Sequence, residues 1–232
     1  IKDNKNEKID LIINFFCSVS INGIYYKLQC FALGLEGLGI GFSVGTAGYY
    51  AEGEEKTDNQ KTGEDYAKKG GAFQNDIGSV FIEYTAGPVT FGVDYHLSDI
   101  VTPEATNVQW TSDTDLTALT NTVKATFENH TTAYISMPIW GGLYAKVSGI
   151  YVDIKTQENL ATGGDYGDTD TTGFTAGLGF QHEVQDGVSV RGEVLGARYG
   201  DVTVNNSKNA TTSVVITEMM GASARISVVK TF

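Results

Sequence analysis

The chain has 232 residues, which is enough for one or two ordinary domains with a buried core. It holds 28 Gly, 12 Tyr and 11 Phe, only 3 Pro, and a net charge of −12. This acidity argues against a nucleic-acid partner, because phosphate binding needs a basic face. No apolar run reaches the length of about 18 residues that a helical membrane span requires. The glycine and aromatic content favours β-structure instead.

Residues 1–32 differ from the rest of the chain. Three lysines precede a short apolar patch, and both cysteines, Cys17 and Cys30, fall in this segment. A basic start followed by an apolar run is the layout of a secretory signal peptide, but polar residues interrupt the run here. We expect residues 1–32 to be a degenerate export segment or an extension, in which the two cysteines can pair in an oxidising compartment. Residues 33–232 then form one domain.

From Leu33 onward, apolar residues alternate with polar or small ones, as in strands whose two faces meet different surroundings. Residues 80–85 and 89–96 show the pattern most clearly and flank a turn at Gly87-Pro88. The alternation predicts eight strands, at about 35–51, 77–86, 89–98, 122–136, 142–154, 172–184, 188–199 and 214–232.

The connections between these strands alternate between long and short. Long connections lie at 52–76, 98–121, 155–171 and 200–213, and short turns lie at 87–88, 138–141 and 185–187. In an up-and-down antiparallel barrel, every long loop then lies at one end. The four long loops hold 16 acidic and 6 basic residues, so they carry −10 of the −12 net charge.

Two kinds of barrel fit the alternation. In a soluble barrel the apolar rows point inward, and in a membrane barrel they meet lipid. The rows opposite the apolar ones are rich in Gly and Ser, which suits a narrow lumen better than a water-facing surface. The sequence therefore favours an all-β, eight-stranded antiparallel up-and-down transmembrane β-barrel. A soluble secreted β-barrel that binds an apolar ligand stays open as an alternative.

The last strand places Ile226, Val228, Lys230 and the final Phe232 on one face. This ending resembles the small outer-membrane barrels of Gram-negative bacteria, of the OmpA transmembrane, OmpX, OmpW or opacity type. Lys230 departs from the pattern, because an apolar residue is usual there. The resemblance implies long extracellular loops, short periplasmic turns, and an outer membrane containing lipopolysaccharide around the barrel. It also implies that Ile226, Val228 and Phe232 form a signal read by the barrel-assembly machinery.

The polar rows bring charged residues to the predicted lumen. Charges in so narrow a space must pair or stay hydrated. We expect either a plug of ion pairs that closes the barrel or a narrow wet path for water and small ions, and the small diameter favours the plug. The residues are Glu83, Asp94, Lys124, Glu128, Lys146, Glu183, Arg191, Glu193 and Arg225, with His96 and His130 as further candidates.

Asp165, Asp168 and Asp170 are the acidic cluster in the loops best suited to a divalent cation. Carboxylate oxygens at short spacing suit Ca²⁺, although solvated loop charge is the simpler interpretation. The sequence contains no catalytic motif and indicates no cofactor. We expect a non-enzymatic structural or surface-interaction role through the acidic loops, with divalent cations as possible loop partners. The alternative is a narrow porin-like channel for small solutes or ions.

Overall fold

The computed structural model describes residues 18–21, 24–27, 36–57, 69–110, 117–161, 163–208 and 212–232. Cys17, Cys30 and the middle of the first long loop lie outside the described residues. β1 (Ser18–Ile21) and β2 (Ile24–Lys27) pair as a hairpin within the expected export-like segment. Every described element is a strand, and no helix there has the length and apolar character to cross a bilayer.

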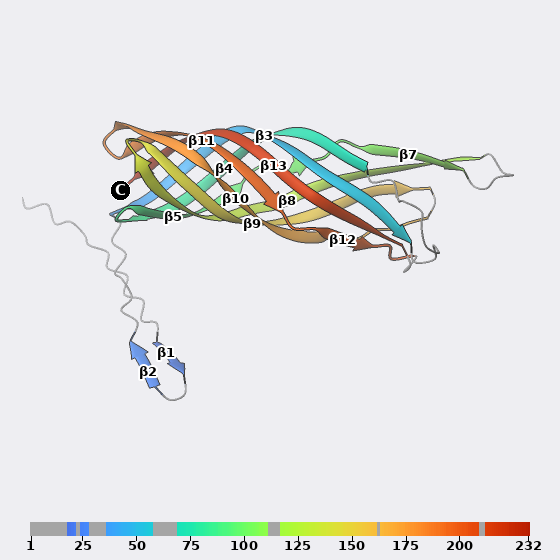
Figure 1. The fold of residues 1–232 in the computed structure, drawn as a ribbon, viewed down its shortest axis with the longest axis horizontal. Coiled ribbons are helices and arrows are strands. Elements are labelled where there is room, and N and C mark those ends of the chain that lie inside the picture. Colours follow the sequence, from blue (N-terminus) through green and yellow to red (C-terminus); the bar gives the residue numbers. More distant parts are fainter. Residues whose placement is uncertain are drawn as a thin grey trace, which may run out of the picture.

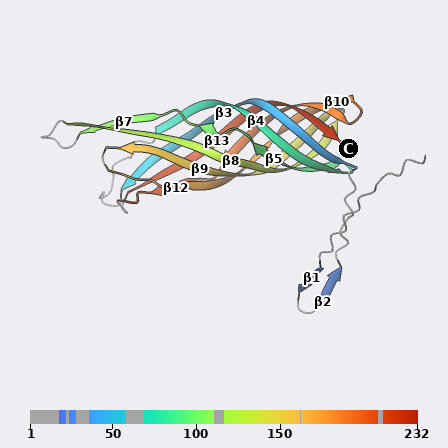
Figure 2. The same cartoon turned by 180° about the vertical axis from the view of Figure 1, so that it is seen from behind.

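The strands from Leu38 onward form one closed antiparallel sheet (Figures 1 and 2). Its elements are β3 (Leu38–Thr57), β4 (Lys69–Ala86), β5 (Val89–His96), β6 (Ile100–Val101), β7 (Ala105–Trp110), β8 (Ala118–Trp140), β9 (Leu143–Leu160), β10 (Thr169–Gln185), β11 (Val188–Tyr199), β12 (Val202–Asn205) and β13 (Thr212–Thr231). β13 pairs with both β11 and β3, which closes the sheet. β5, β6 and β7 pair in succession with β8 and together fill one position in the ring, and β11 and β12 likewise share one position beside β13. The ring therefore has eight strand positions, which we call staves. The predicted eight-stranded up-and-down barrel is confirmed.

Three tight turns lie at the same end of the barrel as the C-terminus (Figure 1). Gly87, Gly141 and Gly187 each have a positive φ, between 58° and 65°, which glycine adopts without strain. The first and last strands meet at this end, where the backbone N–H of Phe232 donates to the carbonyl of Leu38 at 2.9 Å. The short turns of the sequence prediction are therefore confirmed, and they share one end.

The strands run further than predicted at the opposite end. Much of each predicted long loop is strand, so the predicted boundaries are wrong there. Although Ile154 and Val202 point inward and are buried, many other side chains on these extensions are polar on both faces, as with the adjacent Gln74 and Asn75 of β4. The period-two signal therefore weakens while the backbone ladder continues. We call these extensions the crown; it comprises residues 51–57, 69–75, 100–110, 118–127, 153–160, 202–205 and 212–218.

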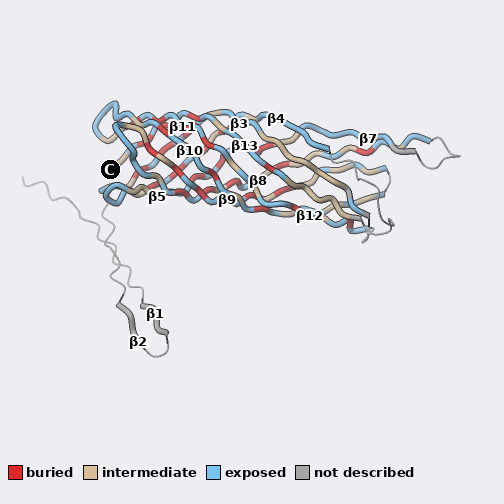
Figure 3. Tube along the Cα trace, in the orientation of Figure 1, coloured by how far each residue is buried: buried red, intermediate tan, exposed pale blue. Residues whose placement is uncertain are grey.

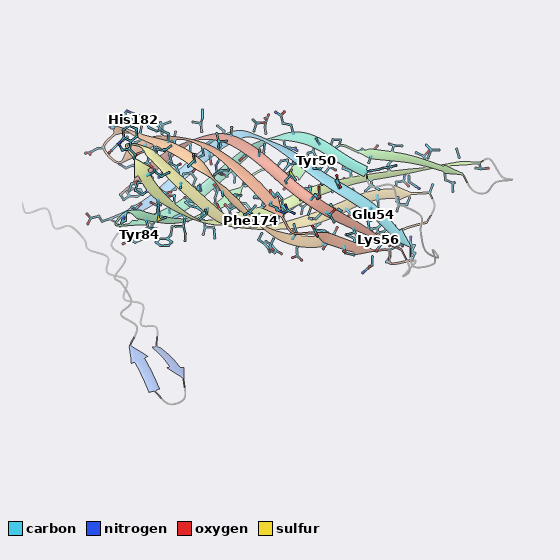
Figure 4. The ribbon with its side chains drawn as sticks, in the orientation of Figure 1. Tyr50, Glu54, Lys56, Tyr84, Phe174 and His182 are labelled. Atoms are coloured by element: carbon cyan, nitrogen blue, oxygen red, sulfur yellow. The ribbon has the colours of Figure 1, made fainter. Side chains whose placement is uncertain are left out.

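The barrel below the crown is apolar outside and polar inside. Buried and exposed positions alternate along its strands (Figure 3). Phe42, Phe91 and Leu178 are about half exposed on the outer face, and Phe174 projects from it in Figure 4. Buried positions alternate with them along every stave and are largely charged, hydroxylated or glycine. A soluble barrel with an apolar ligand cavity requires the reverse arrangement, so that alternative does not fit the structure.

Two bulges change which face a residue occupies. Asn129, with φ 53°, lies at a register shift in β8 between Glu128 and Thr131. Above this shift, Phe127 turns inward and packs against Ile154, although the sequence placed it on the outer apolar row. That placement is corrected, because one extra residue in a strand exchanges its two faces. A similar shift in β13 at Glu218, with φ 54°, brings Ile216 onto the inward face, where it packs against the same buried residues.

Candidate functional site: the barrel lumen

The lumen is crossed near the short turns by a buried ion pair. Arg191 donates through Nη1 and Nη2 to the two oxygens of Glu83, the first at 2.7 Å. Its Nε donates to Oε1 of Gln181 at 2.8 Å, and the hydroxyl of Tyr134 donates to Glu83 at 2.7 Å. Both charged side chains are buried, and a bidentate arginine pair has high geometric specificity. We call Arg191 and Glu83 the lower ion pair.

A second group of charges lies one level higher and joins four staves. Arg225 donates through Nε to Glu193 at 2.6 Å and through Nη1 to Asp94 at 2.9 Å. Lys146 donates to Glu193 at 3.0 Å, and the Tyr144 hydroxyl donates to the same carboxylate at 2.7 Å. These four charged side chains, named the central ion cluster, are all buried and sum to zero charge. Their burial is tolerated because each charge has an opposite partner and hydrogen bonds.

Glycines make room for the large side chains that fill the lumen. A Cβ built on Gly41 would lie 2.1 Å from the Phe81 ring, and one on Gly179 would lie 2.2 Å from the Tyr144 ring. Gly92 bears the same relation to Tyr134, at 2.3 Å. Glycine rows could leave open space for the wet path that is the alternative to a plug. They instead receive aromatic rings from neighbouring staves, so these positions close the lumen.

Above the central ion cluster, the rings of His96 and His130 stack with centroids 4.1 Å apart and planes 22° apart. Nε2 of His130 lies 3.2 Å from the Tyr199 hydroxyl. Both histidines, with Arg225 and Ser148, line a cavity of about 40 Å³, which we call the histidine chamber. Nδ1 of each ring is buried and has no hydrogen-bond partner among the described residues.

The lumen continues differently on the two sides of these layers. Towards the crown, Ile154, Val202 and Met219 form a buried apolar cluster, which Phe127 also contacts. Towards the short turns, a vestibule of about 400 Å³ opens below the lower ion pair and is lined by polar side chains such as Thr90 and Gln181. From turns to crown, the order is therefore vestibule, two charged layers, histidine chamber and apolar cluster.

Six of the nine charged residues predicted for the lumen come together there: Glu83, Asp94, Lys146, Arg191, Glu193 and Arg225. Lys124 and Glu128 do not join them, because the bulge at Asn129 turns that part of β8 and pairs Glu128 with the outward Asp153. Glu183 is exposed near the turn and accepts from the backbone N–H of Gly187 at 2.9 Å. The prediction is corrected for these three residues.

Tyr134 and Tyr144, which complete the carboxylate hydrogen bonding, were missed in the sequence. Each lies on the same parity as a predicted lumen residue, His130 or Lys146, on its own strand. Alternation counted outward from those residues would have located both tyrosines. Their aromatic character instead suggests a lipid-facing row.

The three loop aspartates have separate partners. Asp168 accepts from Lys155 Nζ at 2.9 Å and from the backbone N–H of Thr156 at 3.1 Å. These bonds hold the pKa of the exposed Asp168 carboxyl below its ordinary value. Asp165 accepts from the Ser207 hydroxyl, and Asp170 lies opposite Asp153. In the part of the chain that the structure describes, no three His, Cys, Asp or Glu side chains are grouped to hold a metal ion.

The architecture is similar to that of solved outer-membrane proteins. No protein-family model and no curated protein matches the sequence. The outer membrane protein OprG from Pseudomonas aeruginosa matches with a TM-score of 0.51 at 10% identity, over 85% of this chain and 98% of that chain. The fold is that of an outer-membrane β-barrel. The outer membrane protease OmpT from Escherichia coli gives 0.47 at 9% identity, over 84% and 97%. Neisserial surface protein A gives 0.36 at 12%, over 82% and 97%.

In outer-membrane barrels the last strand carries alternating apolar residues, and β13 has this form. Ile226, Val228 and Phe232 all point outward and are more than half exposed. Lys230 shares their face and donates through Nζ to the carbonyl of Asp186 at 2.9 Å. The resemblance to the OmpA, OmpX, OmpW or opacity type stays a prediction at the level of the individual type.

Proposed function

We propose that this protein is a closed outer-membrane barrel whose role is non-enzymatic and is exercised at the cell surface by its acidic crown. The observation that carries the proposal is the filled lumen. Two charged layers and an apolar cluster cross it in succession, and each buried charge in the layers has a partner. A barrel closed in this way presents its outer end as a surface instead of a pore.

The outer face supports residence in a bilayer. Below the crown, apolar side chains including Phe91 and Leu178 are exposed, and lipid accepts such a face at no cost in hydration. Near the crown the outward side chains become polar, where Asn129 donates to Asp153 at 2.8 Å and Tyr151 donates to the same carboxylate. An ionised carboxylate avoids hydrocarbon, so this cluster marks the headgroup boundary.

The crown has the chemistry of a solvated interaction surface. Glu54 and Lys56 of β3 project at its far end in Figure 4. A hairpin of β7 and the start of β8 extends further than the rest of the crown (Figure 1). With its excess of carboxylates, the crown suits cationic partners or divalent ions shared with lipopolysaccharide phosphates. Insertion by the barrel-assembly machinery, through the outward row ending in Phe232, belongs to the same proposal.

Conductance and surface accessibility test the proposal together. The purified barrel in a planar bilayer at pH 7 should show no stable conductance. A variant with the filling removed, Tyr134→Ala with Tyr144→Ala, should conduct small ions. In intact cells, a protease added outside should cut within the crown and leave the strands below it protected. Steady conductance of the unmodified barrel at pH 7 would overturn the plug, and a crown protected from outside protease would overturn the surface role.

A narrow channel is the second candidate, and the voids along the lumen favour it. The vestibule and the histidine chamber lie in line and are separated only by the two charged layers. Rearrangement of a few side chains would connect them. A channel of this kind would be closed in the arrangement described and open only in another one.

A further inference from the structure

We propose that the stacked His96 and His130 form an acid-operated latch: uptake of a proton by this pair loosens the central ion cluster and opens a narrow path through the lumen. The inference rests on the proposed function in that it takes the barrel to span a membrane and to be plugged at neutral pH. It adds a condition under which the plug opens.

The charge around the pair makes its protonation state decisive. Arg225 from β13 and Asp94 from β5 belong to the neutral central ion cluster directly below the rings. A proton on either ring adds an uncompensated positive charge to a buried space that Arg225 already lines. The other polar groups that line the chamber are neutral hydroxyls, and the rest of the lining is apolar or glycine. The hydroxyls belong to Tyr49 of β3, Thr132 of β8, Ser148 of β9, Thr175 of β10, Tyr199 of β11 and Ser223 of β13.

The added proton acts first on the hydrogen bonding of Asp94. Its Oδ2 accepts from Arg225, while its buried Oδ1 has no hydrogen-bond partner among the described residues. Arg225, the partner of Asp94, lines the same chamber as His130. An imidazolium at this place competes with Arg225 for the same carboxylate. The bond between Asp94 and Arg225, which ties β5 to β13 across the lumen, is then the first contact to weaken.

Loosening that contact joins existing voids. The chamber lies between the central ion cluster and the apolar cluster, and the vestibule lies beyond the lower ion pair. On the crown side, His130 also lines an apolar void of about 30 Å³, together with Phe127 and Met219. A charge on His130 makes that void polar, and a polar void takes up water that an apolar one excludes.

Thermodynamic linkage gives the direction of the response. In the closed barrel a proton on the pair is buried next to Arg225, whereas in an open, hydrated lumen the imidazoles meet water. The open state therefore binds protons better, and a fall in pH shifts the population towards it. The rings stack 4.1 Å apart in the closed barrel, which opposes protonation of both, whereas a hydrated open lumen allows it; opening is therefore coupled to the uptake of up to two protons.

The chain provides its own control for the experiment. It has three histidines, and the third, His182, is exposed near the short turns and away from the chamber (Figure 4). Single-channel recordings in planar bilayers at pH 7, 5 and 4 should show opening frequency rising at least tenfold with acidification. His130→Gln and the double variant His96→Gln with His130→Gln should remove the rise. His182→Gln should keep it.

Folding and proton binding are measured on the same samples. The heat-dependent shift in electrophoretic mobility shows whether each variant is a closed barrel at each pH, and His96→Phe replaces any variant that fails this test. Histidine NMR signals in micelles should show two rings that titrate together with the opening and one that titrates independently. A folded wild-type barrel that stays silent down to pH 4 would overturn the latch and leave the plug intact. Conductance already present at pH 7 would overturn the plug itself.

Discussion

The membrane-level barrel and the crown are built from the same strands, yet different interactions stabilise them. Below the histidine level, each stave has an apolar outer row and an inner row that meets charged layers and tyrosines. In the crown the buried apolar side chains, such as Ile154 and Val202, form one inner cluster, the outer face is largely polar, and the ion pair of Lys155 with Asp168 is exposed. The backbone ladder is continuous through both. Side-chain burial, and with it the sensitivity to substitution, should therefore fall sharply from the barrel to the crown.

Removing a central charge should have the largest effect. Arg225→Ala leaves Asp94 and Glu193 buried without their arginine, and breaking a buried pair in this way costs about 3–5 kcal/mol. Urea unfolding in micelles, followed by tryptophan fluorescence, measures the loss. Lys155→Ala in the crown is the matched control and should leave stability nearly unchanged, because the pair is exposed to solvent. Equal losses in the two variants would remove the distinction between the regions.

A charge on the outer face should have the next largest effect. Leu178→Arg places a guanidinium on the lipid-facing row of β10 and should cost about 2–4 kcal/mol near the bilayer midplane. Val108→Arg in β7 of the crown is similarly exposed and should be close to neutral. Reversible unfolding from lipid vesicles measures both. A neutral Leu178→Arg would mean that β10 does not face hydrocarbon.

The glycines allow a smaller and sharper comparison between the inner and outer faces. Gly179→Ala brings a Cβ to 2.2 Å from the Tyr144 ring and should cost about 1–3 kcal/mol by overpacking. Gly149→Ala on the outer face of β9 meets no heavy atom within 4 Å. It should be neutral or stabilise by up to about 1 kcal/mol through reduced backbone entropy of the unfolded chain. If both variants unfold alike, the lumen is less filled than described.

Removing the crown ion pair of Lys155 with Asp168 should have the smallest effect. It should change the pKa of Asp168 without a measurable change in the stability of the barrel. Lys155 holds the pKa of Asp168 below its ordinary value, so the pair contributes above that ordinary pKa and the contribution is lost as pH falls through the lowered one. Carboxyl carbon NMR should show the pKa of Asp168 rising towards its ordinary value in Lys155→Met. An unchanged titration of Asp168 would show that the ion pair does not form in solution.

The alternating rows made much of the barrel predictable from the sequence. Residues such as Val80 and Ile82 alternate with Phe81 and Glu83, and turn glycines separate the staves. The number of strands, and whether most side chains point to lipid or to the lumen, could therefore be predicted. The crown strands could not be predicted, because polar residues on both faces interrupt their alternation and leave little period to detect. The bulge at Asn129 was equally hidden, since one inserted residue exchanges the faces without changing local composition.

The sequence predicted that ion pairs fill the lumen, but it predicted only some of the residues and none of the individual pairings. Opposite charges on inward rows indicated a plug, and Glu83, Arg191 and Arg225 lie in it. Which carboxylate meets which cation depends on the stagger between staves distant in sequence, and alternation says nothing about stagger. The stacking of His96 on His130 depends on the same register and on the bulge beside His130.

The central claim is that one row of each stave meets lipid and the other fills the lumen, and β13 tests it most directly. Val229 is apolar but fully buried, between the outward Val228 and Lys230. Its hydrophobicity alone predicts a lipid-facing position, whereas the alternation of the strand places it in the lumen. Single cysteines at 226, 227, 228 and 229, in a chain with Cys17 and Cys30 replaced by serine, can carry nitroxide labels in lipid vesicles. Strong relaxation by lipid-soluble oxygen at 226 and 228, and weak relaxation at 227 and 229, is the predicted result. Strong relaxation at 229, or none at 226 and 228, would contradict the account.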